Sequence, residues 1–238
     1  MFEKIFAQIQ AELKVSTDEE YRILIRDHFN MDVSNFLGVR IPHVRKIADK
    51  HFRELKGLEI DEILTLCSQL LETKIYEHKV IAFHWSFKCK NSYEEKHFKI
   101  FERWLKTYVD DWSDCDDLCT HTLGSFIDRF PEFIPNVKTW TGSKNRWLRR
   151  ASAVTFIFMA RKGEHLDTIF EIASKLLLDN DDLVQKGYGW MLKEASKLFP
   201  DEVFEFVIKN KDVMPRTALR YAIEKMPAEY KKAAMKKA

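Results

Sequence analysis

The sequence predicts an all-α protein built from repeated helix pairs, and three observations lead to that fold class. Only seven glycines and six prolines occur among 238 residues. No Asn-Gly or Asp-Gly pair marks a β-hairpin, and alternation of β-branched residues with a period of two is scarce. Apolar residues recur instead at i, i+3, i+4 and i+7 along most of the chain, which is the period of amphipathic helices.

Helical segments can be followed along the chain from its first residue. The N-terminal MFEKIFAQIQAELK mixes charged and apolar residues as an amphipathic helix does, unlike a signal peptide. About a dozen helices of roughly 10 to 18 residues would account for the sequence. Clear periodic segments lie at 19–29, 43–55, 60–72, 79–89, 97–109 and 203–210.

Helix start signals stand in front of several of these segments. Ser16 and Glu19 have the spacing of a capping box, and Pro42 and Pro131 suit the first turn of a helix. The Asn-Asp-Asp run at 180–182 precedes another apolar segment. The connections are short, and no linker rich in Gly, Ser or Pro interrupts them, so we expect one helical domain covering the whole chain, residues 1–238.

Composition indicates a globular protein outside the membrane. With 45% hydrophobic and 32% charged residues, a chain of this length can bury a full core and stay soluble. The sequence has no run of about 18 apolar residues, the length needed to cross a bilayer, so we expect a cytoplasmic location. The net charge of +2 neither requires nor excludes nucleic acid, because binding depends on a local basic patch. The basic C-terminal EYKKAAMKKA is expected to be a solvated end.

The cysteines favour reduced, buried thiols over disulfides or metal. Cys67, Cys89, Cys115 and Cys119 fall mostly inside apolar-periodic segments. The grouping of Cys115 and Cys119 with His121 suggests zinc, but structural zinc needs four ligands and no second cluster follows. GxGxxG, P-loop and GxSxG motifs are missing from the sequence too, and we expect neither a metal nor another cofactor.

A repeat becomes visible when four segments are aligned without gaps on one charged position. They are YEHKVIAFHW around Lys79, SDCDDLCTHTLG around Asp116, WLRRASAVTFI around Arg150 and LVQKGYGWML around Lys186. These anchors are 37, 34 and 36 residues apart, with a second amphipathic helix between them. The repeating unit is then a helix pair, which predicts an α-solenoid of the HEAT type. Chance alignment within an ordinary helical bundle is the alternative.

Equivalent positions in such repeats should line one concave face. Trp112 lies one turn before Asp116, and Trp190 lies one turn after Lys186, so both indoles join the row of anchors. A groove lined by cations, one carboxylate and two indoles could hold a polyanion by its phosphates. It could also offer aromatic faces to an apolar or cationic group.

Four stretches resemble the AlkD-type DNA alkylation repair proteins, helical solenoids that remove alkylated purines from DNA. They are FLGVRIPHVRKI (36–47), DDWSDCDDLCTHTLG (110–124), NRWLRRASAV (145–154) and QKGYGWMLKEASKLFPDEV (185–203). The resemblance covers nearly the whole chain in order and spacing. It implies a right-handed α-solenoid of HEAT-like helix pairs, curved around a concave groove that binds DNA.

The resemblance also implies roles for individual residues. Trp112 and Trp190 would flank the sugar-phosphate of the lesion, Asp116 would lie at the anomeric carbon, and Arg150 would hold the backbone. Where the family has a glutamine that contacts the opposite strand, this chain has an arginine after Leu-Gly-Val, which can still contact phosphate. A second arginine, next to Arg150, stands where the family is often uncharged. The expected DNA-binding residues are Lys79, Arg149, Lys186, Arg40 and Arg45.

The implied chemistry is hydrolysis of the N-glycosidic bond of purines alkylated at N3 or N7. The alkyl group makes the base cationic, so it leaves without being protonated, and the sugar passes through an oxocarbenium-like state. Asp116 would stabilise that state and position or deprotonate the water. The resemblance implies little need for a fully flipped base, and no lysine is placed for lyase activity. We expect a monomer acting on duplex DNA in the nucleoid, without an obligate protein partner.

Spacing alone also supports a structural interpretation of the same residues. Ser113 and Asp116 have the spacing of a capping box, and the neighbouring acids would complement the helix dipole. Apart from Asp116, we expect the acids of this cluster to be capping or solvated residues: Asp110, Asp111, Asp114 and Asp117. The remaining tryptophans lie in apolar-periodic frames and are expected in the core: Trp85, Trp104, Trp140 and Trp147.

Two other functions stay open on the sequence. One is a DNA-binding solenoid that recognises damaged or branched DNA without excising a base, because some branches of the family have lost the catalytic residues. The other is a protein-binding helical scaffold, in which the acidic cluster would meet a basic peptide. DNA binding that falls steeply with salt would separate these two classes.

Overall fold

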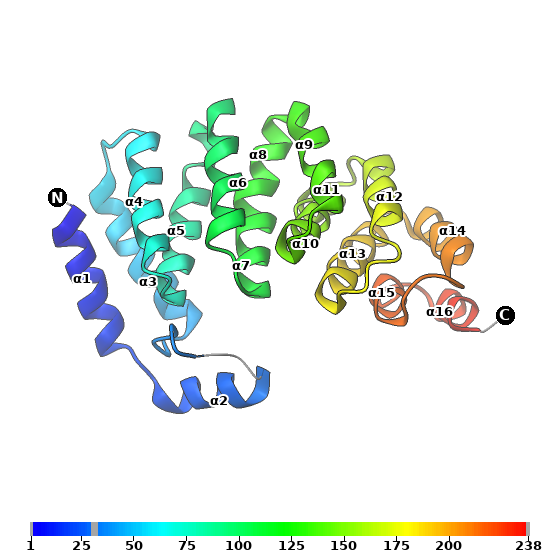
Figure 1. Ribbon diagram of the computed structural model, residues 1–238, viewed down its shortest axis with the longest axis horizontal. Helices are drawn as coiled ribbons and strands as arrows, with labels where there is room; N and C mark the ends of the chain where they lie inside the picture. The colour runs from blue at the N-terminus through cyan, green and yellow to red at the C-terminus, as the bar shows by residue number, and fades with distance from the viewer. Residues whose placement is uncertain (1, 30–32, 237–238) are drawn as a thin grey trace. The chain divides into compact units, whose positions relative to one another are not determined.

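The computed structural model describes residues 2–29 and 33–236, and within them every regular element is a helix (Figure 1). The predicted all-α class is therefore confirmed. The chain forms two compact units, Met1–Ile100 and Phe101–Ala238. None of the described helices is long and apolar enough to cross a membrane.

The described part of the first unit contains the α-helices α1 to α5, with 3₁₀ turns after α3 and after α5. Helix α5 packs against α3 and α4, and α1 packs against α3. The carboxylate of Glu77 is fully buried on α5. It accepts hydrogen bonds from the backbone N–H groups of Leu37, Gly38 and Val39 at 3.0, 2.9 and 3.0 Å. This carboxylate fixes the segment that leads into α3. The elements are α1 (Phe2–Val15), α2 (Glu19–Phe29), α3 (Ile41–Phe52), η1 (Arg53–Leu55), α4 (Ile60–Glu72), α5 (Tyr76–Lys88), η2 (Lys90–Ser92) and η3 (Glu95–His97).

Several helices of the second unit are shorter than the roughly 10 to 18 residues that the periodicity predicted. Helix α6 (Phe98–Thr107) leads into it from the first unit. The other elements are α7 (Trp112–Asp117), the π-helix η4 (Leu118–Leu123), α8 (Gly124–Arg129), η5 (Pro131–Phe133), α9 (Ile134–Thr139), η6 (Trp140–Gly142), α10 (Arg146–Val154), α11 (Ile157–Lys162), α12 (Leu166–Lys175), α13 (Asp182–Ala195), α14 (Pro200–Asn210), α15 (Arg216–Ala222) and α16 (Ala228–Met235).

Helices from successive repeats pack against one another in the second unit. Helix α7 contacts α10, α10 contacts α13, and α13 contacts α15. The repeat anchors Asp116, Arg150 and Lys186 lie on the first three of these helices. Helices α8, α11, α12 and α14 alternate with them in the chain and pack on neighbouring elements (Figure 1). Within this unit, the helices that carry the anchors therefore contact one another in the order of the chain.

Several local predictions can be compared directly with the structure. Pro42 lies in the first turn of α3, and Asp181 caps α13 by accepting a hydrogen bond from the backbone N–H of Leu183 at 3.0 Å, as expected. The Ser16–Glu19 capping box is wrong. Asp18 holds that position instead and accepts from the backbone N–H of Tyr21 at 2.9 Å.

Most of the residues expected in the core are buried. All four cysteines are free and buried, as predicted. Trp85, Trp104 and Trp140 are at most 3% exposed. Trp147 is only half-buried, so its assignment to the core is wrong: its indole lies under the guanidinium of Arg146, with Cζ 5.2 Å from the ring centroid.

Close packing of α13 on α15 depends on a residue without a side chain. A Cβ atom at Gly189 would lie 2.7 Å from Cβ of Tyr221 and 2.9 Å from the carbonyl oxygen of Ala218. Both neighbours belong to the body of α15, so neither can move aside as the tip of a flexible side chain could. Glycine in the GYGW stretch therefore sets how closely these helices approach.

We expect Gly189→Ala to lower the free energy of unfolding by about 1–3 kcal/mol, because the methyl group forces α13 and α15 apart. Urea denaturation checks this. The matched control is Gly142→Ala, since a Cβ there would meet no atom within 4 Å and should change stability by less than about 0.5 kcal/mol. Equal stability of the two variants would contradict the packing argument.

Candidate active site

The acidic stretch that precedes Asp116 is organised by a helix cap. Asp111 is the N-cap of α7, and its Oδ1 accepts hydrogen bonds from the backbone N–H of Ser113 at 2.8 Å and from the Ser113 hydroxyl at 2.6 Å. The predicted Ser113–Asp116 capping box is therefore wrong. Asp116 is left one turn further along, on the same helix as Trp112, whose side chain is 37% exposed.

Asp116 and Arg150 form a two-pronged ion pair between α7 and α10. Nε of Arg150 donates to Oδ1 of Asp116 at 2.9 Å, and Nη2 donates to Oδ2 at 2.8 Å. The Arg150 side chain is 5% exposed and the Asp116 side chain 16% exposed. The third guanidinium nitrogen, Nη1, donates to the backbone carbonyl of Leu183 on α13. One arginine thus joins α7, α10 and α13, the helices that carry three successive repeat anchors.

Space for this arginine is provided by the first glycine of the GYGW stretch. A Cβ at Gly187 would lie 3.2 Å from Cγ of Arg150 and 3.4 Å from its Nη1. A larger residue would press on the stem of the arginine. The two glycines therefore have different roles, since Gly187 accommodates a side chain and Gly189 accommodates a helix.

The electrostatics of the pair follow from its burial. Burial raises the pKa of the Asp116 carboxyl, and the hydrogen bonds and charge of Arg150 offset part of that rise. For Arg150, burial disfavours the cation, but Asp116 raises its pKa above the ordinary value. Because the guanidinium stays protonated, it keeps a negative charge on Asp116 at neutral pH.

A π-helix begins two residues after Asp116. In Leu118–Leu123 the backbone is wound more widely than in the α-helices on either side. The hydroxyl of Thr120 donates to the carbonyl of Asp116 at 2.7 Å, and the carbonyl of Asp117 lies 3.0 Å from Nδ1 of His121. These side chains bind carbonyls at the end of α7. Apolar periodicity gave no indication of the π-helix.

The other acids of the cluster divide into different environments. Asp117 is half-buried, and its Oδ1 lies 3.1 Å from Nδ1 of His121. Asp114 is only 2% exposed, so of its two expected roles, capping or solvated, the solvated one is wrong. It lies in the first turn of α7, facing inward, while Asp111 provides the cap.

Trp190 is half-buried on α13, and it is held by Glu194 one turn further along. Its indole Nε1 donates to Oε1 of Glu194 at 3.1 Å. On the same helix, Nζ of Lys186 lies 2.6 Å from Asp182, with 36% of the lysine side chain exposed. This is a surface pair that an incoming phosphate could replace.

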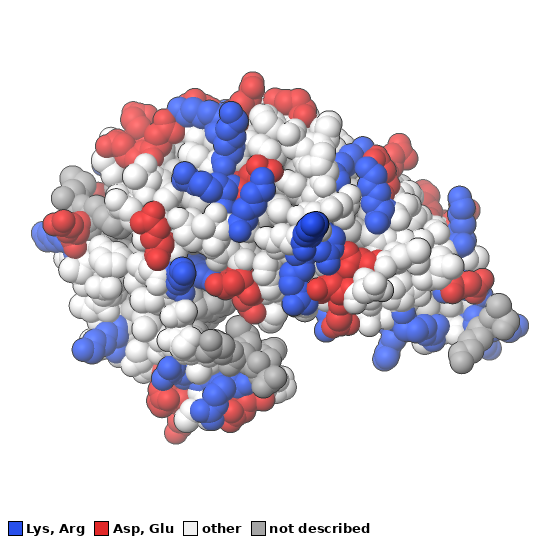
Figure 2. Space-filling view, in the orientation of Figure 1, with Lys and Arg blue, Asp and Glu red and all other residues white. Residues whose placement is uncertain are grey.

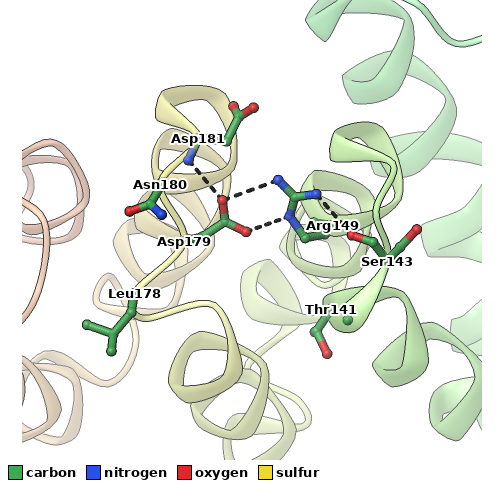
Figure 3. Close-up of a pocket in the computed structure, with 8 residues that line it drawn as sticks. Thr141, Ser143, Arg149, Leu178, Asp179, Asn180 and Asp181 are labelled. Atoms are coloured by element: carbon green, nitrogen blue, oxygen red, sulfur yellow. Dashed lines mark hydrogen bonds and ion pairs between the residues drawn. The ribbon is translucent and has the colours of Figure 1, made fainter.

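Arg149 is engaged within the protein. Its Nε donates to Asp179 at 2.6 Å, and its Nη1 donates to the carbonyl of Ser143 at 2.9 Å. Asp179 in turn accepts from the backbone N–H of Asp181 at 2.9 Å (Figure 3). These residues line an open pocket of about 550 Å³ between the segment that precedes α10 and the segment that precedes α13. Arg149 therefore stabilises this junction.

The expected DNA-binding residues of the first unit have three different placements. Lys79 is only 3% exposed. Arg40 makes a two-pronged pair with Asp18 at 3.0 and 2.9 Å and lies over the ring of Tyr21, 4.6 Å from its centroid. Arg45 is exposed on α3. On the face of the molecule drawn in Figure 2, basic and acidic side chains are interspersed.

The described part of the chain places no three His, Cys, Asp or Glu side chains where they could hold a metal ion.

The sequence matches a known protein family over most of its length. A family model described as DNA alkylation repair enzyme matches residues 9–226. The chain belongs to this family. The matched residues run through both compact units.

Solved structures give the same relationship at the level of the fold. One, from Enterococcus faecalis, is described as a predicted DNA alkylation repair enzyme; it has a TM-score of 0.75 and 16% identity over 90% of this chain and 98% of that chain. AlkD2 from Streptococcus mutans has a TM-score of 0.59 and 17% identity over 88% and 99%. The protein smu.31 from Streptococcus mutans UA159 has a TM-score of 0.58 and 18% identity over 79% and 99%. The comparison with curated proteins found no significant match.

We expect Arg150→Met to lower the free energy of unfolding by about 3 kcal/mol at neutral pH, because it leaves a buried carboxylate without its partner. The pKa of Asp116 should rise further in this variant. The penalty is then largest above that pKa and shrinks as the pH falls through it, since the folded state takes up the proton. Urea denaturation at several pH values measures this.

Arg146→Met is the control on the same helix. Arg146 pairs with Asp181 at 2.8 Å, but its side chain is 45% exposed, so its loss should cost less than about 1 kcal/mol at any pH. A penalty for Arg150→Met that is as small as the control's, or that grows on acidification, would contradict the description of the buried pair.

Proposed function

We propose that this member of the DNA alkylation repair enzyme family is a monofunctional DNA glycosylase. It would hydrolyse the N-glycosidic bond of cationic purines alkylated at N3 or N7 in duplex DNA. The observation that carries this proposal is the carboxylate of Asp116, which is held ionised and in one orientation by Arg150 and is still 16% exposed.

The reaction requires a negative charge near the anomeric carbon, and it does not require an acid to protonate the leaving base. An alkylated purine is already a good leaving group, and its departure creates positive charge on the sugar. Each oxygen of Asp116 accepts one hydrogen bond from Arg150, and a carboxylate oxygen has two acceptor positions. One position on each oxygen therefore remains for a water molecule that attacks the sugar. The reaction needs no cofactor and no proton donor such as Asp117.

The groove for DNA belongs to the same proposal. We propose that the helix pairs form a right-handed α-solenoid of the HEAT type, whose concave side binds the duplex. The sequential packing of α7, α10 and α13 supports this arrangement within the second unit. Trp112 and Trp190 would lie against the sugar of the lesion, each contributing roughly 0.5 to 2 kcal/mol of cation–π attraction when desolvated. The base would not need to be fully flipped.

The basic residues are not equally suited to contact phosphate. Lys186, Arg40 and Arg45 are at least partly exposed, and the ion pairs of Lys186 and Arg40 are surface pairs. Arg149 and Lys79 are much less accessible. We therefore expect the first three to contribute most of the salt dependence of binding. The protein would act as a monomer in the cytoplasm, on nucleoid DNA.

A second function is favoured by the same ion pair. Both oxygens of Asp116 are engaged by Arg150, as they would be if the pair served only to hold the repeats together. The chain would then recognise damaged or branched DNA without excising a base. Measuring binding and excision in parallel separates the two functions.

We expect the wild-type protein to release 7-methylguanine from methylated duplex DNA, and Asp116→Asn to release it at least about 10²-fold more slowly with affinity for DNA retained. Loss of the charge at the anomeric carbon is the physical reason. Asp117→Asn is the control, because Asp117 is the adjacent carboxylate and pairs with His121. Binding by both proteins without release by either would favour recognition over excision.

The rate of release should fall on the acidic side at a higher pH than for an ordinary aspartate, whose pKa is about 3.9. Burial raises the pKa of Asp116, and the protonated carboxyl no longer stabilises the cationic sugar. Single-turnover rates from about pH 4 to about pH 8, corrected for spontaneous release, measure this. A rate that is still unchanged at the acidic end of this range, while the protein stays folded, would count against Asp116 as the catalytic group.

A further inference from the structure

Glu194 is a buried carboxylate with three hydrogen-bond donors around it. It lies on α13, one turn after Trp190, and its side chain is only 6% exposed. It accepts from Nε1 of Trp190 at 3.1 Å, from Nε of Arg161 at 3.2 Å and from Nζ of Lys197 at 2.7 Å. Arg161 belongs to α11, so this carboxylate also connects two helices of the second unit.

The charge of Glu194 is maintained by these partners. Burial raises the pKa of its carboxyl, but the hydrogen bonds from Lys197, Arg161 and Trp190 outweigh burial, and the net pKa is lowered. The side chain is therefore an acceptor for both cations and for the indole at neutral pH.

Two contacts fix the orientation of the Trp190 ring. An indole has one hydrogen-bond donor, and here that donor is committed to Glu194. The guanidinium of Arg161 lies over the ring, with Cζ 5.9 Å from its centroid. Glu194 holds this arginine as well, so a single carboxylate controls both the edge of the indole and the cation above its face.

We propose that Glu194 is the positioning residue for Trp190. This inference rests on the proposed function, in which the indole of Trp190 lies against the sugar of the lesion. Glu194 touches neither the sugar nor the water; it acts by holding the ring in one orientation. Catalysis of this kind is sensitive to orientation, since a misplacement of about 1 Å can cost about 10²-fold in rate.

If Glu194 served only to stabilise the fold, its replacement would lower the free energy of unfolding. The exposure of its partners argues for a small effect on stability. The cations bound to Glu194 are about half exposed, with 52% of the Arg161 side chain and 48% of the Lys197 side chain accessible, so their pairs contribute little to stability. An apolar residue of similar size at position 194 would then leave the fold nearly unchanged. The orientation of Trp190 would be lost, because no acceptor remains for Nε1.

The test compares Glu194→Leu with Glu194→Gln. Leucine removes the acceptor, whereas glutamine keeps an oxygen that Nε1 of Trp190 can reach. Lys197→Met is the control, since it removes a cation from the same carboxylate without touching the indole. The first readout is the indole N–H resonance of Trp190 in the free protein, assigned by its absence from Trp190→Phe. We expect it to shift in Glu194→Leu and to stay near the wild-type position in the other two variants.

The second readout is excision of 7-methylguanine from methylated duplex DNA. We expect Glu194→Leu to lower kcat by about 10-fold to 10²-fold with little change in KM, and Glu194→Gln to recover most of that loss. In a Trp190→Ala background, Glu194→Leu should have no further effect, because the two residues act through one ring.

Additive losses in the double variant, or an unshifted resonance in Glu194→Leu, would overturn the positioning role. Wild-type kcat in Glu194→Leu would overturn it as well. Absence of excision by the wild-type protein would overturn the proposed function and, with it, the catalytic consequence. The indole resonance would then still decide whether Glu194 orients Trp190.

Discussion

The buried pair of Asp116 and Arg150 constrains the second unit more than any other polar contact described above. A charge removed from water must be neutralised by a partner in good geometry, and here each partner comes from a different repeat. Because Arg150 also bonds to the carbonyl of Leu183, three helices must keep one register. The arrangement that would orient a catalytic carboxylate is therefore also the arrangement that aligns the repeats.

A second buried carboxylate, that of Glu194, holds Trp190 by a hydrogen bond. Glu194 accepts hydrogen bonds from an indole and two cations, and the glycines of the GYGW stretch allow α13 to pack closely against Arg150 and α15. Polar groups at the candidate site are thus held by other polar groups, which are positioned by close helix packing.

Sequence reasoning predicted the helical class and a helix start within the Asn-Asp-Asp run at 180–182, because both depend on local pattern. It misplaced two caps, because Asp18 and Asp111 compete with neighbouring polar residues within the same turn. The pairing of Asp116 with Arg150 could not be predicted from the sequence. The alignment gave the two residues equivalent positions, but pairing depends on the direction of their side chains. The π-helix was missed because its signal lies in backbone hydrogen bonds and not in apolar periodicity.

The burial of the cysteines has a consequence for a protein of this family. Reagents that alkylate DNA also attack thiolates, which are the most nucleophilic side chains in proteins. All four thiols are buried, and burial raises the pKa of Cys89 to about 11 and holds the pKa values of Cys67 and Cys115 well above their ordinary range. The fold therefore keeps these four thiols away from electrophiles that also alkylate DNA.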